Sequence, residues 1–427
     1  MRRNFLVNLG NLLLSLSEVT DLANHNIAQH QHRTAYIALE LARIANQQPE
    51  ITENIFMAAL LHDIGAITVE EKISVHNFEA INEEIHTIRG ELLLAQIPWL
   101  RKISKIVRNH HKNWNNWEEG IEEPVVFSSQ IVLLADYVER LIDRNKYILH
   151  QSKDIVEVIK KIADTVVNKE IVAYFVELSK REEFWLDLTS PRLYSLLLNN
   201  GQFKSMQIGL EDVSLISNLY RDLIDFKSRF TATHTMGVSE CAVMLSELFG
   251  LAEIDVKSMR IAGNFHDIGK LVIPNSILEK PGKLTVHEFE IMRCHTYHTF
   301  NTLDSIGGLQ RIAEWAAYHH EKLDGSGYPF HLTNEEIGTG SRIMAIADIF
   351  TAIAEDRPYR KGMDKDEIYM VLKGQADVKL LDKRIVELLF DNFQTISMQV
   401  KEKQSKALDF YELRFLSIVD EVKYIKR

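Results

Sequence analysis

The chain has few of the residues that make crosslinks and tight turns. Its 427 residues include only two cysteines, eight prolines and 19 glycines. Two cysteines cannot build a disulfide framework, so a reducing cytoplasmic compartment is expected. Scarce proline and glycine favour long helices over a sheet with many turns. We therefore expect an all-α protein.

Excess positive charge and long apolar runs are also missing. The net charge of -11 argues against binding of duplex nucleic acid, which needs many cationic contacts. An anionic substrate would need positive charge supplied locally, by a metal or a few Lys and Arg. No stretch approaches 18 uninterrupted apolar residues, so no membrane span is expected. The leucine-rich start, interrupted by Asn8, Gly10 and Asn11, is interpreted as an amphipathic helix rather than a secretory signal.

What the chain does have is histidine, in two parallel series within a length that suggests two or three domains. The first series is His32, His62-Asp63, His86, His110-His111 and Asp136, and the second is His234, His266-Asp267, His295, His319-His320 and Asp348. Successive members of the first series are separated by 30, 24, 24 and 25 residues, and those of the second by 32, 29, 24 and 28, where the last interval runs from the second His of the pair to the Asp. The text AALLHDIGA likewise matches AGNFHDIGK. These matches indicate a tandem duplication.

Each half has the spacing of a helical domain. Apolar residues recur every three or four positions before both His-Asp pairs, as at Ile37 and Leu41 and at Val238, Cys241, Leu245 and Leu248. Each later His pair is expected at a helix end. The helix-stop signature at 199–201 places the boundary near Gly201 and predicts domains over 1–200 and 201–427.

Imidazole and carboxylate together suit divalent iron, manganese, zinc or cobalt, while the lack of paired cysteines argues against a thiolate zinc site. Five His and two Asp per half are too many for one ion, so we expect a binuclear site in which Asp267 bridges. A single His on a helix is more often a packing residue. That interpretation is retained for the residues outside the series: His25, His30, His76, His150, His287, His298, His331, Cys241 and Cys294.

The second half resembles the HD-GYP branch of the HD superfamily of metal-dependent phosphohydrolases. The resemblance rests on HDIGKLVIPNSILEKPGKLT at 266–285, HHEKLDGSGYP at 319–329 and AIADIFTAIAEDRPYR at 345–360. It covers roughly residues 215–390. It implies an all-helical phosphodiesterase that opens cyclic dinucleotides, most often cyclic di-GMP, with two iron or manganese ions.

The resemblance also implies roles for individual residues. One metal would be held by His234, His266, Asp267 and Asp348, and the other by Asp267, His295, His319 and His320. Asp267 and Lys270 would be catalytic, and Lys270, Arg357 and Arg360 would hold the substrate phosphate, which suits their charge and donor geometry. The glutamate that binds a third metal in some members is replaced by Phe230, which argues against a trinuclear site. The GYP loop would border the active site and could contact signalling proteins.

The first half keeps seven metal-type residues but departs elsewhere. Ala66 replaces the lysine that follows HDIG, and neither a GYP loop nor an RPYR counterpart is present. His32, His62, Asp63, His86, His110, His111 and Asp136 therefore form a possible second metal site in a degenerate regulatory or structural domain, with a second active site as the alternative. Trp114 and Trp117 could stack on a purine base or pack against the protein.

The leading hypothesis is a cyclic dinucleotide phosphodiesterase that produces a linear dinucleotide. One alternative is specificity for 3′,3′-cyclic GMP-AMP, and another is a metal-dependent signalling receptor that acts through binding partners. Base preference, native metal and a possible homo-oligomeric state are not encoded in these motifs.

Overall fold

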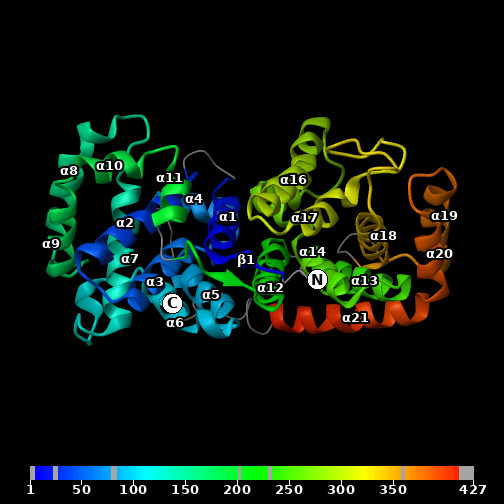
Figure 1. Ribbon diagram of the computed structural model, residues 1–427, viewed down its shortest axis with the longest axis horizontal. Helices are drawn as coiled ribbons and strands as arrows, with labels where there is room; N and C mark the ends of the chain where they lie inside the picture. Colours follow the sequence, from blue (N-terminus) through cyan, green and yellow to red (C-terminus); the bar gives the residue numbers. More distant parts are fainter. Residues whose placement is uncertain are drawn as a thin grey trace. The chain divides into compact units, whose positions relative to one another are not determined.

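The structure is a computed structural model that describes residues 5–22, 27–77, 84–200, 203–228, 233–356 and 361–412 (Figure 1). These residues form 21 α-helices, four short 3-10 helices and two strands of two residues each. The all-α prediction is confirmed. Within the described ranges, every helix is too short or too polar to cross a membrane.

The chain divides into two compact units. Among the described residues, the N-terminal unit comprises 8–207, and the C-terminal unit comprises 208–412 with 5–7. The strands β1 (Val7–Asn8) and β2 (Gln207–Ile208) form one two-stranded sheet. The division therefore falls after Gln207, whereas the expected boundary at Gly201 lies outside the described residues.

In the N-terminal unit, the central helix α2 packs against α3, α7 and α9. Ile37 and Leu41 of α2 are completely buried, as the apolar spacing predicts. The elements are α1 (Leu9–Asp21), α2 (His30–Ile44), α3 (Pro49–Leu61), α4 (Val69–His76), α5 (Glu84–Ala95), η1 (Pro98–Leu100), α6 (Arg101–Asn109), η2 (Trp114–Asn116), α7 (Pro124–Arg140), α8 (Ile148–Lys161), α9 (Lys169–Leu178), α10 (Glu182–Leu188) and α11 (Leu193–Asn200).

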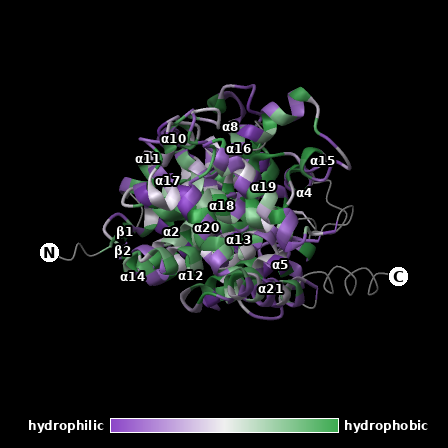
Figure 2. Ribbon diagram, turned by 90° about the vertical axis from the view of Figure 1, so that its right-hand side faces the viewer, coloured by the Kyte–Doolittle hydropathy of each residue, from purple (hydrophilic) through white to green (hydrophobic). Residues whose placement is uncertain are grey.

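In the C-terminal unit, α13 packs against α14, α18 and α21. The middle of Figure 2, around α13, α18 and α20, is largely hydrophobic and the loops at its edge are largely hydrophilic. The elements are α12 (Leu210–Lys227), α13 (His234–Phe249), α14 (Glu253–Phe265), η3 (Ile268–Val272), α15 (Asn275–Leu278), α16 (Val286–Ser305), α17 (Gln310–Ala317), η4 (Tyr318–His320), α18 (Thr339–Ala354), α19 (Lys365–Asp377), α20 (Lys383–Asp391) and α21 (Phe393–Phe410).

The predicted apolar stripe of α13 is buried over most of its length. Val238, Cys241 and Leu245 have no exposed surface, which agrees with a packing role for Cys241. Leu248, the last residue with this apolar spacing, is 43% exposed, so the buried face of α13 ends before it. It lies in the last turn of α13, just before the helix ends at Gly250 with a positive φ of 86°.

The two units repeat one arrangement of helices. The His-Asp pairs follow α3 and α14, and the His pairs follow α6 and α17. Asp136 and Asp348 lie on α7 and α18, which pack against α2 and α13 respectively. The His pairs thus lie at helix ends, as the sequence predicts.

Candidate metal centre

The C-terminal unit brings all seven predicted ligands of the second series into one cluster. Asp267 is central: its Oδ2 lies 3.1 Å from Nε2 of His266, and its Oδ1 lies 3.4 Å and 3.9 Å from Nε2 of His295 and His319. Two oxygens of one carboxylate thus face different histidines, the arrangement that a bridging ligand requires. Asp348 closes the cluster, with Oδ1 3.2 Å from Nε2 of His234 and Oδ2 4.0 Å from Nδ1 of His320.

The glycine of each HDIG motif allows the motif to pack closely against the helix that carries the next histidine of the series. A Cβ atom on Gly269 would lie 1.9 Å from the carbonyl oxygen of His295, and one on Gly65 would lie 2.0 Å from that of His86. Any side chain would push the motif away from α16 or α5. The glycine therefore sets the approach of the motif to its neighbouring histidine.

Backbone carbonyls orient three of the histidine rings. The Nδ1 atoms of His266, His295 and His319 lie 2.8, 2.6 and 2.7 Å from carbonyl oxygens three residues earlier. Because a carbonyl oxygen only accepts, Nδ1 carries the proton and the Nε2 lone pair faces the cluster. Such a second hydrogen bond fixes the tautomer of metal-binding histidines.

Burial and charge set the protonation of the cluster. Burial lowers the pKa of His295 to about 3 and of His320 to about 4, which leaves both rings in the neutral form that binds metals. Burial opposes ionisation of Asp267, but His266 and Lys270 outweigh it and hold its pKa well below its usual range. Burial also disfavours charged His234, yet the neighbouring carboxylates of Asp348 and Glu355 raise its pKa to about 9.

These residues fit divalent metal ions. Nε2 of His266 and Oδ1 of Asp267 are buried without a hydrogen-bond partner among the described residues. Buried polar atoms are rarely left so, and a metal ion would satisfy both atoms at once. Two sets whose ligand atoms lie within 4.8 Å of one another are His234, His266 and Asp348, and His295, His319 and His320.

Lys270 is the one predicted phosphate ligand within the described residues. Its Nζ lies 2.5 Å from Oδ2 of Asp267, so its charge is held at the edge of the cluster. Arg357 and Arg360 lie outside the described residues, as does Phe230.

The GYP loop lies beside His320. The centroid of the Tyr328 ring is 4.9 Å from that of the His320 ring. The Cζ atom of Arg293 lies over the Tyr328 ring, 4.8 Å from its centroid. The buried carboxylate of Glu321 accepts hydrogen bonds from the backbone N–H groups of Phe330 and Leu332, at 2.7 and 3.1 Å. The loop is thus tied to the residue that follows the His pair.

The N-terminal unit contains a similar cluster around Asp63. Its Oδ1 lies 3.4 and 3.7 Å from Nε2 of His86 and His110, and its Oδ2 lies 3.4 Å from Nε2 of His62. His62 and His110 are again oriented by carbonyl oxygens, at 2.8 and 2.6 Å from Nδ1. As in Asp267, one oxygen of the Asp63 carboxylate therefore faces the histidine of the His-Asp pair, and the other faces the two later histidines.

The first histidine of this cluster is His30 and not His32, so the sequence-based assignment was wrong for both. Nε2 of His30 lies 3.4 Å from Asp136 and 3.6 Å from Asp63. Nε2 of His32 instead lies 3.0 Å from the carbonyl oxygen of Leu14. The interval could have shown this, because His30 precedes His62 by 32 residues, as His234 precedes His266.

A buried glutamate behind the first histidine was also missed. Oε2 of Glu139 lies 2.5 Å from Nδ1 of His30 and 3.8 Å from Nδ1 of His76, and Arg144 contacts its Oε1 at 2.9 Å. His76 thus belongs to the cluster and is not a simple packing residue. Glu355 has the corresponding place beside Nδ1 of His234, at 3.7 Å. Neither glutamate belongs to the repeated series, so the sequence carried no signal for them.

Charge at the rim of the two clusters differs. Ala66 leaves Asp63 without a counterpart of Lys270. Arg140 instead contacts Asp136, with its Nη1 2.9 Å from Oδ2. The N-terminal cluster therefore has donors for metal, but among the ion pairs of the described residues Asp63 has no lysine partner such as Lys270. Buried Lys72 interacts with Asp63 only electrostatically, and its Nζ donates to the carbonyl oxygen of Thr20.

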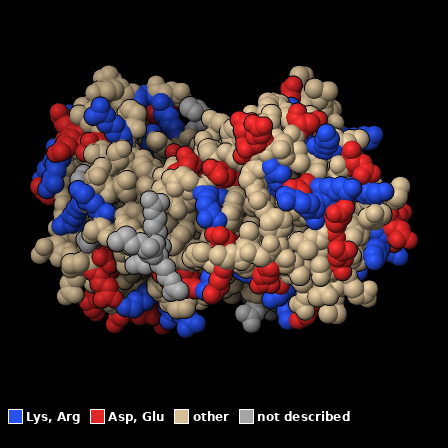
Figure 3. Space-filling model, turned by 45° about the vertical axis from the view of Figure 1, so that its right-hand side comes forward, with Lys and Arg blue, Asp and Glu red and all other residues tan. Residues whose placement is uncertain are grey.

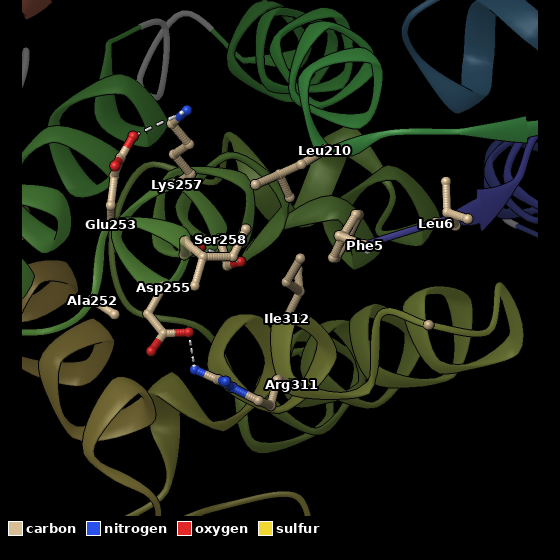
Figure 4. A pocket seen from close by; sticks show the side chains of 12 residues that line it. Phe5, Leu6, Leu210, Ala252, Glu253, Asp255, Lys257, Ser258, Arg311 and Ile312 are labelled. Carbon is tan, nitrogen blue, oxygen red and sulfur yellow. Dashed lines mark hydrogen bonds and ion pairs between the residues drawn. The ribbon is translucent and has the colours of Figure 1, made fainter. Parts of the chain in front are cut away.

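A separate hollow of about 940 Å³ lies in the C-terminal unit, lined in part by Leu6, Leu210 and Ile312 (Figure 4). Its charged side chains pair with each other, as Asp255 does with Arg311 at 2.5 Å. None of its lining residues belongs to the two histidine series. On the face drawn in Figure 3, acidic and basic side chains are intermixed, as on an ordinary solvated surface.

Comparison with models of known protein families identifies one domain around each cluster. Models of the HD domain match residues 218–385 and 27–141. The chain belongs to the HD-domain family and carries two HD domains in tandem.

Named relatives match either most of the chain or a smaller part of it. The 3'3'-cGAMP-specific phosphodiesterase 1 of Vibrio cholerae is 29% identical over 91% of this chain and 92% of its own length. A cyclic di-GMP phosphodiesterase of Thermotoga maritima is 38% identical over 39% of this chain and 45% of its own. A crystal structure of a cyclic GMP-AMP-specific phosphodiesterase of V. cholerae matches with a TM-score of 0.64 at 19% identity, covering 92% of this chain and 98% of that one.

Proposed function

We propose that the C-terminal unit is an HD-GYP-type phosphodiesterase that hydrolyses a cyclic dinucleotide to a linear dinucleotide. The observation that carries the proposal is the position of Asp267. Its two carboxylate oxygens face different histidines, and Nζ of Lys270 contacts one of these oxygens, Oδ2. The names of the relatives point to the same class of substrate.

The chain supplies ligands, orientation and charge. Two divalent ions, iron or manganese, would provide Lewis acidity and activate water for attack on phosphorus. His234, His266, Asp267 and Asp348 would hold one ion, and Asp267, His295, His319 and His320 the other. Lys270 would place positive charge beside the scissile phosphate, joined by Arg357 and Arg360. Such fixed donors stabilise charge that develops in the transition state.

Between cyclic dinucleotides, similarity over the whole chain favours 3′,3′-cyclic GMP-AMP. The V. cholerae relative named for that nucleotide covers both HD domains, whereas the Thermotoga maritima relative named for cyclic di-GMP covers 39% of the chain. Motifs of the second half alone favour cyclic di-GMP, so both nucleotides belong in the test.

The test is hydrolysis by full-length protein reconstituted with Mn²⁺ or reduced iron. Cyclic di-GMP, 3′,3′-cyclic GMP-AMP and cyclic di-AMP would be incubated separately and their products separated by chromatography. We expect a linear dinucleotide from at least one, and no product from H266A/D267A protein. Tight binding without turnover by metal-loaded parent protein would instead support the receptor alternative.

We further propose that the N-terminal unit is regulatory or structural, because Ala66 and the missing GYP loop leave its cluster without the lysine and the loop found beside the C-terminal cluster. A cytoplasmic location, a homo-oligomeric state and contacts of the GYP loop with signalling proteins stay predictions.

A further inference from the structure

A pocket of about 470 Å³ opens beside the cluster of the N-terminal unit. It is lined by Glu84, Thr87, Arg108, Asn109, His111, Lys112 and Asn116. His111 also belongs to a possible metal-binding group with Asp63, His86 and His110, whose ligand atoms lie within 4.8 Å of one another. One side chain therefore joins the pocket to the cluster.

One ring nitrogen of His111 is available to bind a metal ion. Its Nε2 is buried and has no hydrogen-bond partner among the described residues. The ring lies 4.1 Å from that of His110 and 5.0 Å from that of His86, measured between centroids. A buried nitrogen without a partner is costly, and a metal ion held with Asp63 would satisfy it.

The pocket lies beside His111, whose counterpart in the other unit contacts a tyrosine ring. His320 occupies the position of His111 in the second series, and the ring of Tyr328 lies 4.9 Å from it. In the first half, the chain after His111 reads KNWNNW and has no tyrosine loop. The missing loop leaves room beside His111 for a ligand.

Two cationic side chains line this pocket. Arg108 donates to Oγ1 of Thr87 at 3.0 Å, and its Nε lies 3.7 Å from Glu91, so the guanidinium is held in place. Nζ of Lys112 lies 4.0 Å from the centre of the Trp117 ring. Arg and Lys together with a metal ion are the groups that bind phosphate oxygens.

We propose that the N-terminal unit binds a divalent ion and, in this pocket, the phosphate of a nucleotide that it does not hydrolyse. The volume falls within the range of about 300–1,000 Å³ typical of small-molecule sites. Ala66 stands at the position of Lys270, so the first cluster lacks the lysine that contacts the central carboxylate in the other unit and would stabilise the transition state of hydrolysis there. The first HD domain is thus a ligand site and not a second active site.

The test uses full-length H266A/D267A protein, which disables the other cluster, and titrates GMP with and without Mn²⁺ by calorimetry. We expect one Mn²⁺-dependent GMP site per chain. R108Q/K112Q should weaken it at least tenfold, while K102Q/K105Q, the same charge change at exposed positions of α6, should alter affinity less than twofold. Glutamine keeps much of each side-chain stem, and circular dichroism would verify folding.

Two results would overturn the proposal: no Mn²⁺-dependent GMP binding despite metal bound in the first half, or equal weakening in both double variants. Inorganic phosphate that competes with GMP would support recognition through the phosphate. Because turnover is not measured, the outcome is independent of whether the C-terminal unit hydrolyses cyclic dinucleotides.

Discussion

Lys270 lies one turn beyond Asp267 and places its Nζ 2.5 Å from Oδ2 of that carboxylate. Ala66 occupies the same place after Asp63. Two clusters with matching central carboxylates thus differ in the positive charge beside them, and this difference separates the proposed catalytic unit from the proposed ligand site.

Replacing Lys270 should slow hydrolysis without removing metal. Donors aimed at developing charge typically contribute a hundredfold or more to the rate. Single-turnover hydrolysis by metal-loaded Lys270→Ala protein is therefore expected to fall at least about a hundredfold. Lys257→Ala, an exposed lysine paired with Glu211, is the matched control. A rate within threefold of the parent for Lys270→Ala would refute the role, and Ala66→Lys should create no activity.

Replacing Asp267 should remove metal and turnover together. Its carboxylate is the only one in contact with His266, His295 and His319 among the ion pairs of the described residues. We expect Asp267→Ala to lose bound metal by elemental analysis, while circular dichroism stays close to that of the parent. Retention of two ions and of a near-normal rate would contradict the bridging role.

His30 and His32 offer a test of the N-terminal cluster. In H266A/D267A protein, the remaining metal should be lost in His30→Ala and kept in His32→Gln, because only His30 contacts Asp63 and Asp136. His32→Gln keeps an N–H donor for the Leu14 carbonyl. Elemental analysis of both proteins decides the matter, and equal metal content in the two would disprove the assignment.

Lys227 should be a positioning residue for Lys270. Its buried Nζ donates to the carbonyl oxygens of Lys270, Leu271 and Ile273, at 2.9, 2.7 and 2.7 Å. Methionine cannot donate hydrogen bonds, so the three carbonyl oxygens would lose their charged donor. Lys227→Met should therefore lower the free energy of unfolding by about 3 kcal/mol.

Lys257→Met serves as the control and should change stability by less than about 1 kcal/mol, because exposed ion pairs contribute little. Chemical denaturation measures both variants. A purely structural role would leave kcat of the folded Lys227→Met protein unchanged, whereas displacement of Lys270 would lower kcat with metal content retained.

Several features followed from the sequence because they are local or repeated. Apolar residues every three or four positions predicted helices, and low proline and glycine content supported them. The His-Asp pairs and the His pairs recur in order, which was enough to predict two clusters. Ala66 could be compared with Lys270 because the flanking HDIG text aligns without gaps.

The tertiary structure decided between His30 and His32, a choice that the 32-residue interval to His62 also favoured. Only the tertiary structure brought Glu139, Glu355 and Lys227 to their sites. Successive residues on a helix point about 100° apart, so His30 and His32 leave opposite sides of α2 and both are buried. Which side faces Asp63 depends on how α2 packs against α3 and α7. That packing is decided by contacts between residues far apart in the chain, and no local pattern of residues specifies it.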